Sequence, residues 1–461
     1  MSAVPSQAIS PRDVPVTATL AERARTLGFE DLPQDIRRLT RQCLLDWLAV
    51  TLAGAPEPLT RILAEEIGEQ GGKPEASVIG HPFKTSMLQA ALLNGSASHA
   101  LDYDDVNIAF TGHPSVAVIP ALLALAEVRG ASGKDFMTAF VAGYETICRA
   151  GSLVAPGHYN LGFHSTGTVG TFGAAAACAR LLGLNRQQTA YALGIAGTQA
   201  AGLKSMFGTM CKPLHAGKAC YNGLLAARLA ARGFTSREDV LECPQGFAAT
   251  HGPDYAPETA LADPAGGFHL RNNLFKYHAA CYGTHAAIEC ARRLRQERRL
   301  DPAQIRQVVV RVDPESDKVC NIQNPRTGLE AKFSLRLTVA FALLGIDTAG
   351  LDSYSEVNAG DPAVIQMRDK IRVELAVGRG FAITDAEMRV ELADGSCFEA
   401  RHDSGVPAAD LRQQGEVLEA KFHSLAGPLL GAERAQRIAG LVAKLEELPN
   451  LSELVGLCVP A

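Results

Sequence analysis

Two histidines and three aspartates fall within the stretch HALDYDDVNIAFTGHPS, residues 99–115, directly before a long apolar run. These residues are His99, Asp102, Asp104, Asp105 and His113. Charged groups at this density are costly to bury, so the stretch needs a reason to stand at the start of a core helix. It has three interpretations: a solvated loop in which Ser115 caps the helix, a metal site, or a site for acid/base chemistry.

Two further polar clusters also precede apolar helices. His164 stands in GFHSTGTVGTFGAAAA, where a helix N-terminus suits an anion, although a lone histidine there is more often a cap or a core residue. Lys212 and His215 stand in KPLHAGKA. A lysine is ordinarily a solvated surface residue, but the surrounding glycines and proline imply a tight path on which both side chains could point inward.

A fourth cluster, FKYHAACYGTH, contains Lys276, His278, Cys281 and His285. It lacks the nearby base that would identify Cys281 as a nucleophile.

Helices position the first three clusters, because residues from about 17 to 260 have almost continuous helical patterning. One helix should end at Gly130, and the next should begin at Ser132, with Asp135 completing a capping box, and end at Gly151. The Gly/Ala-rich run after His164 predicts a helix that is buried on all sides.

The hydrophobic period changes after residue 267. The stretches QIRQVVVRVD, DKIRVELAVG and AEMRVELADGSCFEARH alternate like strands, and Asp394-Gly395 predicts a hairpin turn. Helical patterns recur at 284–296, at 329–346 and from 408 onward. We therefore expect a mainly α protein with an α+β second domain. A large helical domain from residues 1–266 and 408–461 would accompany a smaller α+β domain with an antiparallel sheet at 267–407.

Composition is that of an ordinary globular chain, with 47% hydrophobic and 20% charged residues among 461. A net charge of −5 without a basic run argues against nucleic-acid binding. The N-terminus has no signal-peptide pattern, and no apolar run is long enough for a membrane span. The 11 cysteines include no C-x-x-C pair. We read them as reduced thiols and expect a cytoplasmic protein.

Taken in order, the motifs resemble the MmgE/PrpD family, which includes 2-methylcitrate dehydratase, cis-aconitate decarboxylase and iminodisuccinate epimerase. The resemblance runs from about residue 20 to the C-terminus. It rests on NGSASHALDYDDV, GHPSVAVIPALLALAE, GYE, FHSTGTVGTFGAAAA, KPLHAGKA and EAKFSLRLTVAFALL.

This resemblance implies a helical domain built from both chain ends, an α+β lid domain, a homodimer, and a pocket between the domains. It also implies a small di- or tricarboxylic acid as substrate, with neither a metal nor an organic cofactor. The implied catalytic residues are Asp102, His113, His164 and Lys212. The resemblance also implies Cys281 as a pocket residue with His215 close by. We expect His215, Lys276, Cys281 and Arg336 to bind the substrate.

Two positions depart from the family pattern. Val106 stands where the decarboxylase carries a threonine, and Leu337 stands where decarboxylase and dehydratase carry a tyrosine. The stretch FGTMCKPLHAGKA looks more like the epimerase side of the family. The leading interpretation is a cofactor-independent lyase, a dehydratase that removes a proton next to a carboxylate. The alternatives are an epimerase, a decarboxylase, a metal-dependent hydrolase built on His99, Asp102 and Asp104, and a non-catalytic helical scaffold.

Overall fold

The computed structural model describes residues 14–378 and 380–460. Its internal contacts divide the chain into two compact units. The first comprises the chain up to Asn273 and again from Asp410, and the second is Leu274–Ala409. The first is helical and the second combines helices with a sheet, so the chain is mainly α with an α+β region, as the sequence predicts.

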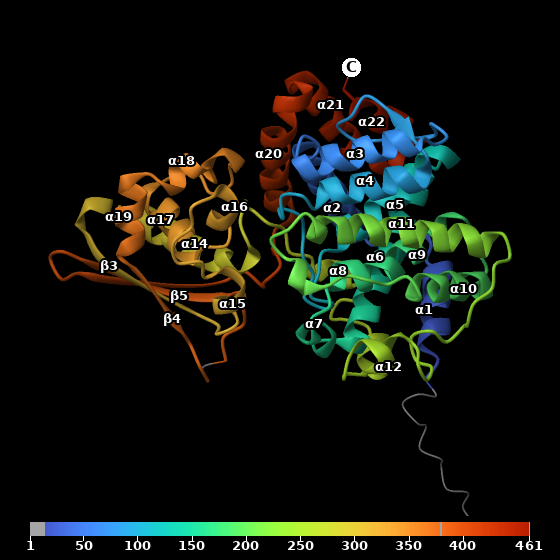
Figure 1. Cartoon of the computed structure of the whole chain (residues 1–461), viewed down its shortest axis with the longest axis horizontal. Coiled ribbons are helices and arrows are strands. Elements are labelled where there is room, and N and C mark those ends of the chain that lie inside the picture. Colours follow the sequence, from blue (N-terminus) through green and yellow to red (C-terminus); the bar gives the residue numbers. More distant parts are fainter. Residues whose placement is uncertain (1–13, 379, 461) are drawn as a thin grey trace, which may run out of the picture. The chain divides into compact units, whose positions relative to one another are not determined.

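The first unit is built almost entirely of helices. They are α1 (Val16–Thr26), α2 (Gln34–Gly54), α3 (Pro58–Gln70), α4 (Met87–Ser98), α5 (Pro114–Arg129), α6 (Gly133–Val154), α7 (Gly157–Leu161), α8 (Ser165–Thr168), α9 (Gly170–Leu181), α10 (Arg186–Gly197), α11 (Cys211–Ala231), α12 (Phe247–His251), α13 (Pro257–Leu261), α20 (Leu411–Leu430), α21 (Ala432–Ala443) and α22 (Ser452–Leu457). Short 3₁₀ turns are η2 (Phe29–Asp31), η3 (Lys204–Met206), η4 (His269–Asn272) and η7 (Leu445–Glu447), and β1 (Ala76–Ser77) pairs antiparallel with β2 (Lys84–Thr85). The returning helix α20 packs along α2 (Figure 1).

Close helix crossings at the centre of this unit depend on glycine. Helix α4 meets α11 where a Cβ added to Gly95 would lie 2.8 Å from the Cα of Gly217. Because His99 directly follows α4 and Lys212 lies in the first turn of α11, this crossing brings two of the polar clusters together. The Gly/Ala-rich helix α9 is buried over most of its length, as predicted.

The junction between α5 and α6 agrees with the sequence prediction, whereas the C-terminal end of α6 does not. Helix α5 ends at Gly130 in the left-handed conformation, and Ser132 and Asp135 form the predicted capping box of α6. The predicted end of α6 at Gly151 is wrong, because the helix continues to Val154. Gly151 instead leaves room for Phe110, since an added Cβ would overlap the Cβ of Phe110 and lie 2.7 Å from its Cα.

We expect Gly151→Ala to lower the free energy of unfolding by about 1–3 kcal/mol, because the buried Phe110 must move to admit the methyl group. Urea unfolding followed by the fluorescence of Trp47, the single tryptophan, measures the change. Gly68→Ala in α3 is the matched control. Nothing lies within 4 Å of its added Cβ, so the better helix former should stabilise by about 1 kcal/mol. Equal stability of Gly151→Ala and wild type would contradict the tight contact.

The second unit contains a four-stranded sheet of order β4-β3-β5-β6. The strands are β3 (Ile305–Val312), β4 (Ile371–Leu375), β5 (Asp385–Leu392) and β6 (Cys397–Asp403). Its helices and turns are α14 (Tyr282–Arg298), α15 (Ser316–Cys320), α16 (Gly328–Ala331), α17 (Leu335–Leu344), α18 (Glu356–Ala359), α19 (Pro362–Asp369), η5 (Pro302–Gln304) and η6 (Leu351–Ser353). The predicted Asp394-Gly395 hairpin joins β5 to β6. The pairing of β3 with β4 is parallel, so the sheet is mixed rather than wholly antiparallel.

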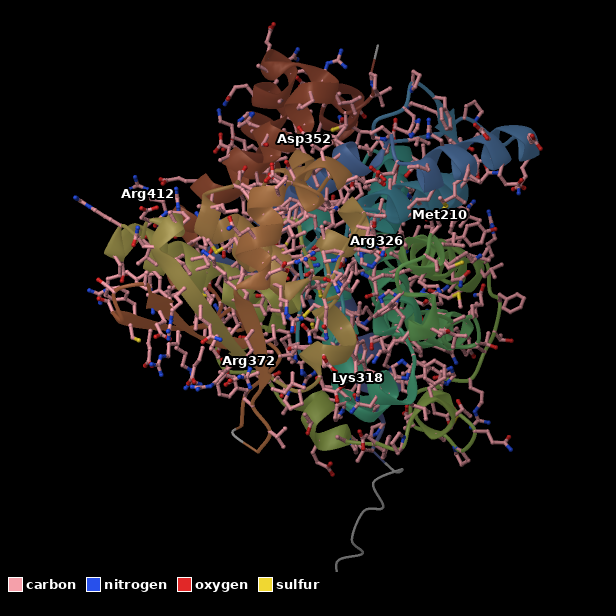
Figure 2. The ribbon with its side chains drawn as sticks, turned by 60° about the vertical axis from the view of Figure 1, so that its left-hand side comes forward. Met210, Lys318, Arg326, Asp352, Arg372 and Arg412 are labelled. Carbon is pink, nitrogen blue, oxygen red and sulfur yellow. The ribbon has the colours of Figure 1, made fainter. Side chains whose placement is uncertain are left out.

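One face of this sheet is apolar and the other is charged. Val308, Val310 and Val312 are buried, and helices α14 and α17 lie over the sheet (Figure 1). Arg372 of β4 is exposed (Figure 2). Its Nε lies 3.6 Å from Glu374 Oε1. This alternation is the period-2 signal that identified the strands in the sequence. No helix in the described parts of the chain combines the length and apolarity needed to cross a bilayer.

Candidate active site

Three polar segments of the first unit converge at the ends of its central helices: the loop between α4 and α5, the residue before α8, and the first turn of α11. His113 is the N-cap residue of α5, and its backbone N–H donates to Thr166 Oγ1 at 3.2 Å. This bond ties the first segment to the one that carries His164. Asp102 has a φ of +52°, a left-handed conformation that few residues other than glycine adopt.

Asp104 lies between two imidazoles. Its carboxylate oxygens are 2.9 and 3.0 Å from His99 Nδ1, and one of them is 2.9 Å from His113 Nδ1. Burial alone would raise the pKa of Asp104, but the two imidazoles hold it well below its usual value. A carboxylate only accepts hydrogen bonds, so His99 Nδ1 carries the hydrogen. Burial lowers the pKa of His99 to about 4, so His99 is neutral near pH 7.

Asp102 joins His113 to the lysine of α11. Lys212 Nζ donates to Asp102 Oδ1 at 2.7 Å, and His113 Nε2 lies 3.7 Å from the same oxygen. Three side chains of the cluster are partly exposed: Asp102 at 17%, His113 at 13% and Lys212 at 11%. Those of His99 and Asp104 are buried, at 0% and 1%. The first three are therefore the members of this cluster that a solute can reach.

His164 adjoins this group from the other side. Its ring stacks with that of His99 at a centroid distance of 5.8 Å, and its Nδ1 lies 3.0 Å from His215 Nδ1. Burial, followed by the positive charge of neighbouring groups, lowers the pKa of His164 well below its usual value. The four predicted catalytic residues and His215 therefore occupy one cluster in the first unit, and their chemical roles stay predictions.

The third aspartate, Asp105, holds the start of α5. Its carboxylate accepts from the backbone N–H of Ser115 at 3.2 Å and from the Ser115 hydroxyl at 2.5 Å. The expected N-cap role of Ser115 is therefore wrong: the helix begins at Pro114, and Asp105 accepts the hydrogen bond that a cap would accept.

A buried lysine from the C-terminal return supports the same loop. Lys421 Nζ donates to Asp46 Oδ1 at 2.6 Å and to the Tyr103 carbonyl at 2.8 Å, and it lies 3.8 Å from the Tyr103 ring centroid. Tyr103 separates Asp102 from Asp104 in the sequence. Lys421 therefore fixes the backbone between the two aspartates that contact His113.

Asp105 should make folding stability depend on pH. Burial raises the pKa of Asp105 from the usual aspartate value of about 4 to about 7, so the stability that Asp105 contributes is present below about pH 4 and is lost as the pH rises through about 7. Asp105→Asn removes this titration and keeps an acceptor for Ser115. We expect its stability relative to wild type to improve between pH 4 and pH 8 by on the order of 2–4 kcal/mol. Urea unfolding at both pH values measures the difference in free energy of unfolding between the variant and wild type. A difference that does not change with pH would contradict the raised pKa of Asp105.

The other three predicted substrate-binding residues belong to the second unit. Lys276 and Cys281 are buried, and Cys281 is the N-cap residue of α14. Arg336 donates to Asn321 Oδ1 at 3.1 Å and to the Ile371 carbonyl at 3.3 Å. Their part in substrate binding stays a prediction.

The cluster also has the composition of a metal site. His99, Asp102, Asp104 and His113 offer ligand atoms that all lie within 4.8 Å of one another. A cation there would compete with the Lys212 ammonium for Asp102 and with His99 for Asp104. The observed contacts already compensate both carboxylates, which makes the set a network of ion pairs and hydrogen bonds.

The predicted site residues left out His99 and Asp104, which the structure places beside His113. The signal was available in the same motif, because His99 and Asp104 stand in the stretch that carries Asp102 and His113. Sequence reasoning missed Lys421 and Asp46 entirely, and no local pattern marks either residue.

The arrangement defines a helical unit that gathers histidines, aspartates and a lysine at its helix ends, together with an α+β unit. The MmgE/PrpD N-terminal domain matches residues 18–260 and the MmgE/PrpD C-terminal domain matches residues 278–447. The chain belongs to the MmgE/PrpD family.

Its relatives include three proteins of similar length. The cis-aconitate decarboxylase of Homo sapiens is 30% identical over 96% of this chain and 94% of its own. The cis-aconitate decarboxylase-like protein oryM of Aspergillus oryzae is 29% identical over 96% and 97%, respectively. A cis-aconitate decarboxylase of Aspergillus terreus is 27% identical over 96% and 95%.

Proposed function

We propose that this chain is a cofactor-independent lyase that removes a proton from the carbon next to a carboxylate of a small di- or tricarboxylic acid, with dehydration as the outcome. The observation that carries the proposal is the cluster in which His113, Lys212 and Asp102 meet, with His164 adjoining. A carbon acid of this kind is weak, so the site must stabilise the enolate-like charge that develops as the proton leaves.

Each residue has a distinct role in this proposal. Lys212, held in place by Asp102, binds a substrate carboxylate and balances the developing negative charge. His113 is the base: its Nδ1 faces the Asp104 carboxylate, which leaves Nε2 to take the proton. The electron pair of the broken C–H bond forms a carbon–carbon double bond. The β-hydroxyl leaves as water after taking a proton from a donor, for which we propose His164.

Decarboxylation is the second candidate, and the names of the relatives favour it. In that reaction a carboxylate leaves as carbon dioxide, and the donor protonates the carbon that receives the electron pair. The apolar, buried Val106 offers no proton donor where the decarboxylase carries a threonine, and this departure is the reason for placing dehydration first. Leu337 departs from the decarboxylase and the dehydratase alike, so it does not separate the two reactions.

The test is incubation of the purified chain in deuterium oxide with a panel of di- and tricarboxylates, followed by proton NMR. Alkene formation without gas release supports dehydration, and carbon dioxide release with deuterium at the product carbon supports decarboxylation. Deuterium exchange with inversion and no other product would indicate an epimerase. Absence of exchange and of product across the panel would contradict the proposal. An assay after treatment with a chelator separates these outcomes from the metal-dependent hydrolase.

We also propose that the enzyme is a cytoplasmic homodimer. The eleven cysteines of the sequence include no C-x-x-C pair, which fits a reducing compartment. The dimer rests on the family resemblance, and light scattering of the purified chain at micromolar concentration tests it.

A further inference from the structure

The contact between His164 and His215 joins two nitrogens of the same kind. Nδ1 of each ring faces Nδ1 of the other at 3.0 Å. A neutral imidazole has one nitrogen that donates and one that accepts, so a hydrogen bond between the two Nδ1 atoms requires a hydrogen on only one of them. The tautomers of the two rings are therefore complementary: whichever ring donates through Nδ1, the other carries its hydrogen on Nε2.

Two glycines and one backbone carbonyl hold the pair in this orientation. A Cβ added to Gly167 would lie 2.9 Å from His215 Cβ, and one added to Gly202 would lie 3.3 Å from His215 Cγ. The Gly202 carbonyl accepts from the backbone N–H of His164 at 3.0 Å. The space for the His215 ring thus exists because both neighbours lack a side chain, and Gly202 fixes the backbone of His164 as well.

The surroundings favour a neutral pair. Burial lowers the pKa of both imidazoles, and the positive charge of Lys212 lowers both further. His164 is 2% exposed, whereas His215 is partly exposed, so water can reach the outer ring of the pair more easily. The edge-to-face packing of His164 on Phe207, with 4.9 Å between ring centroids, restricts rotation of the inner ring.

We infer that His215 is a positioning residue that donates its Nδ1 hydrogen to Nδ1 of His164 and so keeps the hydrogen of His164 on Nε2. In this tautomer Nε2 of the partly exposed His215 accepts a hydrogen bond from water, whereas the inner ring is too buried to rely on water. His164 then presents an N–H group to the reacting molecule. This inference deepens the proposed function, on which it rests for the identity of His164 as the proton donor.

The test uses two variants and a readout that does not depend on turnover. His215→Phe fills the same space without a nitrogen, and His215→Asn returns an N–H donor close to the position of Nδ1. Nitrogen-15 NMR of histidine-labelled protein distinguishes protonated from unprotonated ring nitrogens. Comparison with the spectrum of His164→Asn assigns the signals of His164 among the twelve histidines.

In wild type and in His215→Asn we expect Nε2 of His164 to carry the hydrogen and Nδ1 to be unprotonated. In His215→Phe we expect a mixture of both tautomers. We expect kcat for the substrate that the carboxylate panel identifies to fall about 10- to 100-fold in His215→Phe with little change in KM, and to recover in His215→Asn. The same His164 signals in wild type and His215→Phe would overturn the inference. A change of tautomer in a protein that turns over no carboxylate would instead overturn the proposed function and leave the inference standing.

Discussion

Replacing His113 by alanine should lower kcat by about 10²- to 10⁴-fold and leave KM almost unchanged, because a positioned base acts in the transition state more than in substrate binding. His113 is the histidine of the cluster that both aspartates approach: its Nδ1 is 2.9 Å from Asp104 and its Nε2 is 3.7 Å from Asp102. The side chain of His113 is 13% exposed. The side chain of His99, whose Nδ1 also lies 2.9 Å from Asp104, is fully buried. Steady-state kinetics on the substrate found in the carboxylate panel gives both constants.

Three comparison variants separate this role from a general loss of structure. His423→Ala removes a histidine of α20 that contacts Glu419 outside the cluster, and its kinetics should match wild type. Lys212→Ala should mainly raise KM, because it removes the ammonium that binds a carboxylate, and Lys218→Ala on the same helix is its exposed counterpart. Full activity of His113→Ala would exclude His113 as the base.

The three aspartates of the opening motif show what the sequence could not settle. Asp102 pairs with Lys212, Asp104 lies between two imidazoles, and Asp105 holds Ser115. The left-handed backbone at Asp102 helps to turn neighbouring side chains in different directions. Residue type and spacing indicate that carboxylates and imidazoles are close, but the backbone conformation decides which pair forms.

Features set by local periodicity were predictable. The capping box of Ser132 and Asp135 depends on a spacing of three residues, and the strand at Val308, Val310 and Val312 depends on alternation. The parallel pairing of β4 with β3 was not predictable in the same way, because it depends on a partner about 60 residues away.

Glycine has two structural uses in this chain, and the sequence alone does not distinguish them. Gly130 ends a helix, whereas Gly151 lies inside one and admits the Phe110 side chain from the loop. Each has no side chain, and only the position of a distant neighbour shows which property is used.

Lys421→Met should lower the free energy of unfolding of the first unit by about 3–5 kcal/mol, because it leaves the buried Asp46 carboxylate without its cation. Lys421 and Asp46 are 8% and 2% exposed, and their atoms are 2.6 Å apart although 375 residues separate them. Trp47 follows Asp46 on α2 and is itself buried, so its fluorescence during urea unfolding reports on this unit directly.

Two further variants test whether the cost comes from the unpaired charge. Lys421→Met combined with Asp46→Leu removes both charges, and we expect it to recover most of the lost stability. Arg412→Met on the same helix breaks the exposed pair with Glu416 at 3.2 Å and should cost less than about 1 kcal/mol. Because Lys421 also donates to the Tyr103 carbonyl, the double variant should remain less active than wild type even where its stability returns. Full activity in the double variant would show that the loop keeps its conformation without Lys421, and equal instability of the single and double variants would show that the ion pair is not the cause.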